Sequence, residues 1–562
     1  MALDRCVFAA RVLDTAHRLE LETRVERLVE FYRALGDPRL STRWLDRLDA
    51  VVGVIDFGAR PHELDRPLTW GGSLPPELAG AEALLSAPGA QLRALDRVIG
   101  AIAASDDELC VIEGAGTGFP VFHEARSSFA ETWSRHAVAA GWLAYGSVTI
   151  DPDAVVELVG YNFVGGNRSM VRDVTVLDSS TRIRVDGNGS THEVWWPPPE
   201  RWALVPEDDA YAHTEAALLE SLGRRITKEP VLLGLTAGLD SRVAAVALQV
   251  LGIPFEAVTV GAPGHVDVDG AAVVAAALGI HHRVIPIEPT QSSSPSAAAD
   301  AQARWNDGSG RATAVRSGAS DLGAVTFVTG GGGETGRCLL YRLTARNYHH
   351  PTQAQLAKLA TPTARMEAAR SEAVGVVQRC SQQAVARAYG LGLQGWHALD
   401  VVAADERERR VYRALSTPGS SEFVEAFCIP DIQRGLTSLS LAERLNDGFH
   451  RRFIERHAPA VAPAPGPSQR PGLPPIARRL ASVLRRHSRR EEPGPRVAVP
   501  AELREWLGQV LSSALLIDPL GPAWAKRVGE AMAAGDPEGL ETALIATGPV
   551  ALQRALEQAG FA

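Results

Sequence analysis

The spacing of apolar and polar residues changes character near residue 206. Before it, an amphipathic stretch at 19–35 predicts a surface helix, and the short apolar runs VVGVIDFG, ELCVIEG and WLAYGSVTI predict strands separated by Gly and Pro. After it, apolar runs predict strands at 231–235, 255–260, 283–287 and 325–329, with helical stretches at 242–251 and 268–278. Strands that alternate with helices predict an α/β fold with a parallel sheet covered on both faces.

The length of 562 residues exceeds one ordinary hydrophobic core, so several domains are expected. We predict a layered α+β domain at 1–205 and a parallel α/β domain at 206–457. A Pro-rich and basic segment follows at 458–498, and helices at 499–562 are expected to pack back on the second domain. The basic run at 476–490 suits an acidic peptide or partner protein, or is a solvated face; the sequence leaves both open.

Composition narrows the classes of function. With 45% hydrophobic and 22% charged residues the chain has the make-up of a soluble globular protein, and a net charge of −9 offers no general attraction to nucleic acid. No apolar run reaches the roughly 18–20 residues of a membrane span. The five cysteines are scattered, without the spacing of a zinc site or a disulfide framework. We therefore expect a cytoplasmic protein with neither nucleic-acid nor membrane partners.

The segment VLLGLTAGLDSR at 231–242 carries the clearest chemical signal. It predicts a strand, a loop of small residues and a helix, an arrangement that presents backbone N–H groups and a helix N-terminus to an oligophosphate. Asp240 lies inside this anion site, where a carboxylate is repulsive unless a divalent cation such as Mg²⁺ intervenes. The alternative is that Asp240 and Ser241 only cap the helix.

Two other nucleotide motifs are excluded. Lysine occurs only at Lys228, Lys358 and Lys526, and none follows a glycine, so no Gly-Lys-Ser/Thr phosphate loop is present. The glycines at 331, 333 and 336 satisfy GxGxxG, but no acidic residue occurs from 335 to 366. A dinucleotide site needs an acid about 20 residues after the motif, so this pattern does not predict one.

LTAGLDSR resembles the Ser-Gly-Gly-x-Asp-Ser pyrophosphate loop of the asparagine synthetase family, with Thr236 and Ala237 in place of the first Ser and Gly. Residues 260–282 are similar to the family's second strand, specificity turn and following helix. TGGGGE, ending at Glu334, resembles its second acidic loop. The resemblance implies an ATP-pyrophosphatase domain behind a glutaminase-like domain, and DAVVELVGYNF at 153–163 is weakly similar to the latter's last part.

The resemblance also implies a set of site residues. Asp240 and Glu334 would share Mg²⁺, although a surface acid on a Gly-rich loop is the alternative for Glu334. The implied catalytic residues are Asp240, Glu334 and Arg451. The implied ATP-binding residues are Leu235, Thr236, Ala237, Gly238, Leu239, Asp240, Ser241, Val260, Thr329 and Gly330.

Three departures from the family restrict the activity. Residue 2 is Ala2, so the N-terminal nucleophilic Cys of a glutaminase is absent, and Cys6 is interpreted as a packing thiol. No lysine lies between 358 and 526, so Arg451 or Arg452 would replace the family's late Lys, unless both belong to a solvated helix face. Gly331 stands where asparagine enzymes have Glu and β-lactam synthetases have Tyr.

These features together imply an ATP-dependent ligase that adenylates a carboxylate, releases pyrophosphate and passes the acyl group to an amine. The expected activity is that of a lasso peptide macrolactam cyclase or a similar ligase of specialised metabolism. The substrate would be a peptide carboxylate, with a leader peptidase or precursor-recognition protein as partner. The alternatives are an ammonia-dependent asparagine synthetase, a β-lactam synthetase-like enzyme, and a non-catalytic binding homologue.

Overall fold

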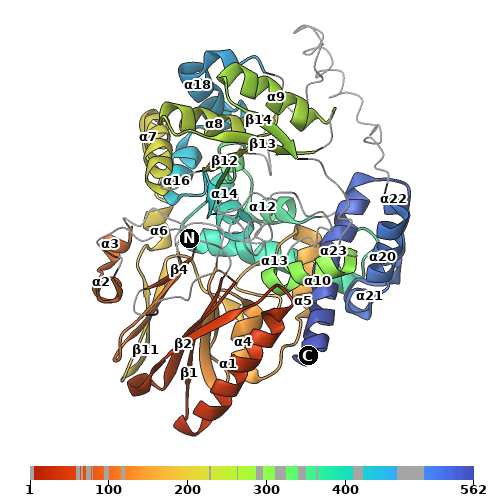
Figure 1. Cartoon of the computed structure of the whole chain (residues 1–562). Helices are drawn as coiled ribbons and strands as arrows, with labels where there is room; N and C mark the ends of the chain where they lie inside the picture. The colour runs from red at the N-terminus through yellow and green to blue at the C-terminus, as the bar shows by residue number, and fades with distance from the viewer. Residues whose placement is uncertain are drawn as a thin grey trace.

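The computed structural model describes residues 5–57, 64, 67–70, 78, 80–93, 100–114, 120–226, 230–261, 264–285, 295–309, 325–338, 350–362, 365–408, 422–464 and 499–562. The chain forms a sheet-rich first region, a parallel-sheet region and a group of C-terminal helices beside both (Figure 1). In the described part of the chain, no helix is long and apolar enough to cross a membrane.

Two antiparallel sheets form the first region, with strand orders β2-β3-β1-β8-β7-β9 and β11-β10-β6-β5-β4. The strands are Arg5–Val12 (β1), Arg39–Leu45 (β2), Ala50–Asp56 (β3), Leu68–Trp70 (β4), Gly100–Ala104 (β5), Leu109–Ile112 (β6), Phe122–Glu124 (β7), Ala130–Ser134 (β8), Thr175–Val176 (β9), Thr181–Asp186 (β10) and Gly189–Val194 (β11). The helices are Arg18–Arg33 (α1), Ala81–Ser86 (α2), Gly89–Arg93 (α3), Ala137–Tyr145 (α4), Pro152–Tyr161 (α5) and Pro198–Arg201 (α6).

The alternation of side chains along β1 explains the layers. Successive residues of a strand point to opposite faces, and all of β1 from Cys6 to Ala10 is buried. Phe8 joins an apolar cluster with α1 and α4, whereas Val7 joins a cluster with Val111 of the second sheet. The far face of that sheet, including Cys110, packs on α2. The first region is therefore a helix–sheet–sheet–helix stack.

The second region contains a five-stranded sheet in which every neighbouring pair is parallel. Its strands are Val231–Gly234 (β12), Glu256–Val260 (β13), His282–Ile285 (β14), Thr326–Thr329 (β15) and Glu422–Glu425 (β16), and the accompanying helices are Glu207–Arg225 (α7), Leu239–Val250 (α8) and Val266–Leu278 (α9). The order β14-β13-β12-β15-β16 confirms the predicted parallel sheet and adds β16. The direction of winding reverses between β12 and β15.

Helices dominate the remainder of the described chain. They are Pro295–Asn306 (α10), the 3-10 helix Gly333–Arg337 (η5), Gln353–Ala360 (α12), Ser371–Gly390 (α13), Gly395–Val401 (α14), Pro430–Ser438 (α16), Leu441–Leu445 (α17), Gly448–His457 (α18), Ala501–Leu511 (α20), Ala514–Leu520 (α21), Pro522–Ala533 (α22) and Pro537–Ala559 (α23).

The C-terminal helices pack against both regions. Leu507, Trp524 and Leu552 share one apolar cluster with Val155 of α5, and Phe561 stacks on Trp142 of α4 with ring centroids 3.7 Å apart. Helix α23 also runs along α10. Residues 499–562 were expected to pack on the second domain, and they do contact α10 and α13 of that segment. Their apolar faces also complete the core of the first region, which the sequence did not indicate.

One expected strand is a helix, and most of one expected segment lies outside the described residues. The run WLAYGSVTI was predicted as a strand, but its first four residues belong to α4, which is apolar on all sides and buried from Ala137 to Ala144. Of the predicted Pro-rich and basic segment, residues 465–498, which include the basic run at 476–490, lie outside the described residues. A short 3-10 turn, Pro459–Val461, follows α18 directly.

Candidate functional site

The loops after β12 and β15 meet at the carboxyl edge of the parallel sheet. Ligands of open α/β sheets bind beyond the strand ends where the winding reverses, and these two strands flank that point. A β-carbon built on Gly330 would lie 2.5 Å from the backbone nitrogen of Ser241. One built on Gly333 would lie 2.4 Å from Asp240 Oδ1. The two acidic motifs found in the sequence therefore touch, and glycine permits the contact.

The other glycines of the second loop serve close packing as well. Gly332 has a φ of +84°, and a β-carbon there would lie 2.8 Å from Cys428 Sγ. A β-carbon on Gly336 would lie 2.6 Å from Leu436 Cδ2 of α16. The Gln433 side chain of α16 donates to the Gly332 carbonyl at 3.0 Å. The Gly-rich run is thus fixed between α8, α16 and the segment after β16.

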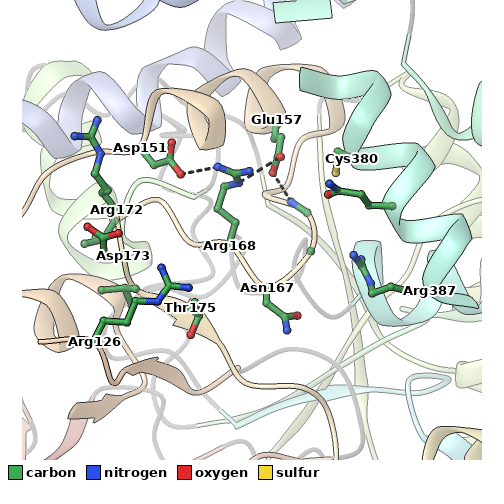
Figure 2. Close-up of a pocket in the computed structure, with 15 residues that line it drawn as sticks. Arg126, Asp151, Glu157, Asn167, Arg168, Arg172, Asp173, Thr175, Cys380 and Arg387 are labelled. Atoms are coloured by element: carbon green, nitrogen blue, oxygen red, sulfur yellow. Dashed lines mark hydrogen bonds and ion pairs between the residues drawn. The ribbon is translucent and has the colours of Figure 1, made fainter. Parts of the chain in front are cut away.

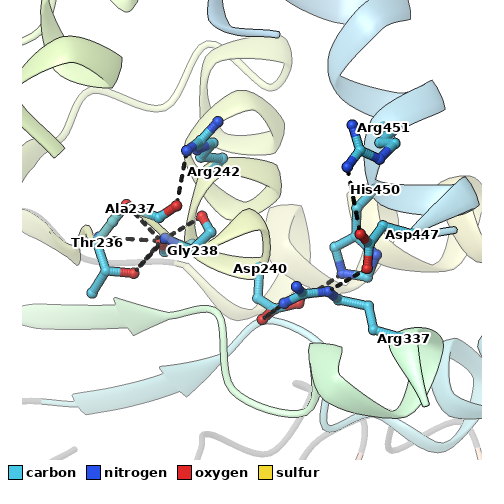
Figure 3. Close-up of polar contacts among 10 residues, drawn as sticks. Thr236, Ala237, Gly238, Asp240, Arg242, Arg337, Asp447, His450 and Arg451 are labelled. Carbon is cyan, nitrogen blue, oxygen red and sulfur yellow. Dashed lines mark hydrogen bonds and ion pairs between the residues drawn. The ribbon is translucent and has the colours of Figure 1, made fainter. Parts of the chain in front are cut away.

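The loop between β12 and α8 is closed by its own hydrogen bonds (Figure 3). Thr236 N donates to Ser241 Oγ at 3.1 Å, and Gly238 N donates to Thr236 Oγ1 at 3.0 Å. Ala237 N donates to Asp267 Oδ1 at 3.2 Å. The backbone contacts to phosphate predicted for Thr236, Ala237 and Gly238 would therefore have to displace protein oxygens.

The N-terminus of α8 is the better anion site within this loop. Gly238 is the N-cap residue of α8 and supplies no capping side chain. The N–H groups of the first turn, from Leu239 to Ser241, carry the positive end of the helix dipole. Neither Asp240 nor Ser241 is the N-cap, so the interpretation of these residues as simple caps is wrong.

The Asp240 carboxylate lies between the side chains of Arg337 and His450. Arg337 Nη1 donates to Asp240 Oδ2 at 2.9 Å, and His450 Nε2 lies 2.8 Å from Oδ1 without hydrogen-bond alignment (Figure 3). Burial is the largest single influence and raises the pKa of Asp240, but His450 and Arg337 together outweigh it, so the pKa lies below its usual range. The carboxylate therefore remains ionised at neutral pH. His450 itself is fully buried on α18.

Arg337 bridges Asp240 to a second carboxylate. Its Nε donates to Asp447 Oδ1 at 3.0 Å, and the two acids bind opposite ends of one guanidinium that is only 14% exposed. Arg337, His450 and Asp447 were not identified from the sequence. Arg337 follows Glu334 by three residues in TGGGGETGR, so its position within the motif was the available signal.

Arg451 does not take the place expected of it. Its side chain is 59% exposed, its Nε donates to the Asn446 carbonyl at 3.1 Å, and its Nη2 lies 3.6 Å from Asp447 Oδ2. Arg452 is 61% exposed. The buried face of α18 presents His450 toward this site in place of Arg451. The guanidinium in direct contact with Asp240 is that of Arg337, from η5.

Positive charge nevertheless accumulates around the start of α8. Arg242 donates from Nη2 to the Ala237 carbonyl at 2.8 Å and is 1% exposed. Burial, Arg451 and Arg337 together lower its pKa to about 10. Burial and the two neighbouring guanidinium groups thus destabilise the charge of Arg242, and an anion bound nearby would stabilise it.

The residues present suit Mg²⁺ bound largely by phosphate. This ion commonly takes one or two carboxylates together with phosphate oxygens and water. Asp240 and the half-buried Glu334 come from loops in contact, and Asp240 Oδ1 is buried without an aligned hydrogen bond. Among the described residues, no group of three or more His, Cys, Asp or Glu side chains could hold a metal. Sharing of one cation by Asp240 and Glu334 stays a prediction.

The residues expected near the adenosine divide into two kinds. Val260 ends β13 at the carboxyl edge and is 40% exposed, which suits contact with an aromatic base. Thr329 ends β15, and its Oγ1 accepts from Gly331 N at 3.2 Å. Leu235 is fully buried, and its N–H donates to the Val258 carbonyl at 2.9 Å, so it supports the loop rather than offering a ligand contact.

Cys6 is a core residue of the first region, as the sequence predicts. It is fully buried in β1, and burial raises the pKa of its thiol to about 12 despite hydrogen bonds with Tyr32 and Ser134. The nucleophilic thiolate is therefore scarce at neutral pH.

We expect iodoacetamide to label Cys380 well before Cys6 in the native protein. Cys380 is partly exposed on α13, whereas the other four cysteines are buried. Peptide mass spectrometry after timed quenching gives the order of labelling, and denatured protein supplies the control in which all thiols react. Early labelling of Cys6 would show an accessible thiolate and would contradict the packing role.

A separate cavity of about 410 Å³ lies between α13 and the chain that follows α5 (Figure 2). Arg168 donates to Asp151 at 2.8 Å and lies 3.5 Å from Glu157, which accepts from Gly165 N at 3.0 Å. A β-carbon on Gly165 would lie 2.4 Å from Cys380 Sγ. None of the predicted site residues lines this cavity, and the polar contacts of Arg168 and Glu157 named above lie within the first region.

Comparison with known proteins assigns no family. No family model matches the chain, and no curated protein matches it. Among solved structures, the chain is similar to glutamine phosphoribosylpyrophosphate (PRPP) amidotransferase from B. subtilis, complexed with ADP and GMP, at 11% sequence identity. The match has a TM-score of 0.19 and covers 59% of this chain and 77% of that chain. A TM-score this low does not show a shared fold.

Proposed function

We propose that the protein is an ATP-dependent carbon–nitrogen ligase that activates a carboxylate as its adenylate. The observation that carries this proposal is the meeting of Asp240, at the start of α8, with the Gly330–Gly333 segment that leads into Glu334. Both loops leave neighbouring strands where the winding of a parallel sheet reverses, which is where such folds bind nucleotides.

The proposed reaction has two steps. A carboxylate oxygen forms a bond to the α-phosphorus of ATP while the bond to the β-phosphate bridging oxygen breaks, and pyrophosphate leaves. The nitrogen of an amine then attacks the acyl carbon, AMP leaves with the former carboxylate oxygen, and the amine loses a proton as the amide forms. Neither step needs a covalent bond to the protein, so alignment and electrostatic stabilisation are the protein's tasks.

The chain's own residues supply these effects. The N–H groups at Leu239 to Ser241 and the guanidinium of Arg337 lie where negative charge on an oligophosphate would be stabilised. Asp240 and Glu334 would hold Mg²⁺, which when bound neutralises phosphate oxygens. Val260 would contact the base from β13.

The source of the amine is inferred from the first region. Buried Cys6 supports a domain without glutamine hydrolysis, so we propose that the amine belongs to the substrate or to free ammonia. A peptide that supplies both groups would give a macrolactam, as in lasso peptide cyclases. Free aspartate with ammonium, as in asparagine synthetases, and β-lactam formation are the narrower alternatives.

A non-catalytic nucleotide-binding protein is the second candidate. The hydrogen bonds from the N–H groups of Thr236, Ala237 and Gly238 to protein oxygens favour a lack of turnover, since they occupy the donors that would align the phosphates for reaction. The uncapped N-terminus of α8 would still bind a nucleotide. Binding without turnover would then be the whole function.

Carboxylate-dependent exchange of labelled pyrophosphate into ATP tests the ligase directly. The probes are synthetic peptides with one internal Asp or Glu and a free N-terminus, and separately aspartate with ammonium chloride. We expect exchange with at least one peptide and none with the peptide amidated at its acidic side chain. ATP binding by calorimetry with no exchange and no AMP formation would favour the non-catalytic protein.

A further inference from the structure

The guanidinium of Arg337 has two differently constrained ends. At one end, Nε donates to Asp447 Oδ1 at 3.0 Å; at the other, Nη1 donates to Asp240 Oδ2 at 2.9 Å. Both acids are mostly buried, with side chains 7% and 16% exposed. Figure 3 shows the side chain lying between the start of α8 and the start of α18.

The contact between Arg337 and Asp447 is the fixed one. Asp447 is the N-cap of α18 with a left-handed backbone, at a φ of +59°, and its second oxygen lies 3.6 Å from Arg451 Nη2. Its backbone carbonyl also accepts from Arg451 N at 3.0 Å in the first turn of α18. A residue held by its backbone and by both carboxylate oxygens has little freedom to follow a ligand.

The contact between Arg337 and Asp240 is the one that has to break. If Asp240 binds a divalent cation, its carboxylate cannot also keep the full ion pair with Arg337, because two cations would then compete for one charge. Release of Nη1 leaves Arg337 still anchored through Nε. Its free N–H groups would then face the region where the N-terminus of α8 attracts phosphate.

We propose that Arg337 is a one-ended clamp on this site, an inference that rests on the proposed function. Without nucleotide, Arg337 neutralises Asp240 and excludes a divalent cation. With nucleotide and cation, it stays anchored to Asp447 and binds oligophosphate oxygens, in the role for which the sequence offered Arg451. Arg337 is thus a nucleotide-positioning residue that also makes cation binding depend on nucleotide.

The neighbouring arginines fit this role less well. Arg242 uses Nη1 and Nη2 on the Ala464 and Ala237 carbonyls, at 2.9 and 2.8 Å. Arg451 is 59% exposed and makes no direct contact with Asp240 among the described residues. Arg337 therefore combines burial, a direct bond to Asp240 and an independent anchor.

Two binding measurements on Arg337→Gln test the clamp. Glutamine keeps hydrogen-bonding capacity between the two acids but removes the charge. Titration of Mn²⁺ followed by its EPR signal, without nucleotide, should show about 10-fold or greater tightening, because Asp240 loses its competing cation. Calorimetry with ATP and Mg²⁺ should show about 10- to 100-fold weaker binding, because a charge-assisted contact is lost.

Opposite changes in the two affinities distinguish a clamp from a structural ion pair, whose loss would weaken both. Asp447→Asn should weaken ATP binding without tightening Mn²⁺, since Arg337 still neutralises Asp240. Arg456→Gln, on the same helix but paired with Glu215 at 3.2 Å, away from this site, is the matched control and should leave both affinities unchanged. Circular dichroism and thermal melting check folding, and if Arg337→Gln does not fold, Arg337→Lys is measured in its place, with smaller shifts of the same two signs.

The outcomes separate this inference from the proposed function. Tighter Mn²⁺ binding by Arg337→Gln with wild-type ATP affinity would overturn the positioning role. Unchanged Mn²⁺ affinity would overturn the clamp, whatever the ATP result. Wild-type protein that binds no ATP at all would overturn the proposed function and, with it, the nucleotide-positioning part of the inference.

Discussion

Asp240→Asn should abolish carboxylate-dependent pyrophosphate exchange, with a loss of at least about 10²–10³-fold, the scale seen when one preorganised charge-stabilising group is removed. The amide keeps the size of the carboxylate and can still accept from Arg337, but it has lost the charge that would hold Mg²⁺ at the phosphates. The exchange assay measures the loss, and ATP calorimetry with and without Mg²⁺ assigns it to cation-dependent binding.

Asp300→Asn is a suitable control for that experiment. Asp300 also pairs with an arginine, Arg554, and its side chain is 18% exposed against 16% for Asp240, but it lies on α10 outside the site. Both variants should lose similar small amounts of stability, whereas only Asp240→Asn should lose exchange. Equal activity in the two variants would remove Asp240 from the reaction and leave its ion pairs as a purely structural feature.

The parallel sheet was predictable because its strands are short apolar runs bounded by loops of small residues. The strands that begin at Val231, Glu256, His282 and Thr326 start within one residue of the predicted positions. Two elements were not predictable from local pattern. Helix α4 is buried on all sides, so it has no polar face to reveal its period, and β16 is a four-residue strand with Glu at both ends.

The candidate site was only partly predictable, for a related reason. Asp240 and the Gly-rich loop lie in contiguous motifs, so their local sequence reveals them. The partners of Asp240 are 97 and 210 positions away in the chain, at Arg337 and His450, and depend on how η5 and α18 pack around α8. The sequence of α18 offered Arg451 as the inward cation, but its apolar face, with Phe449 and Phe453, turns His450 inward instead.

The close approach of the two loops can be tested by adding one methyl group. Gly330→Ala would place Cβ 2.5 Å from the backbone nitrogen of Ser241 and 2.6 Å from the backbone carbon of Asp240, neither of which can rotate away. We expect about 1–3 kcal/mol of lost stability from overpacking. We also expect a large loss of exchange, because the start of α8 must move relative to the loop that carries Glu334.

The matched change is Gly508→Ala, at an exposed position inside α20 where an added β-carbon meets nothing within 4 Å. That variant should gain about 0.5–1 kcal/mol, since alanine is favoured over glycine within helices. Urea denaturation gives both free energies of unfolding. Exchange is measured without urea, at a temperature where each variant is folded. A fully folded Gly330→Ala protein with wild-type exchange would mean that catalysis does not require the contact between these loops, and the proposal of a shared cation at Asp240 and Glu334 would fail with it.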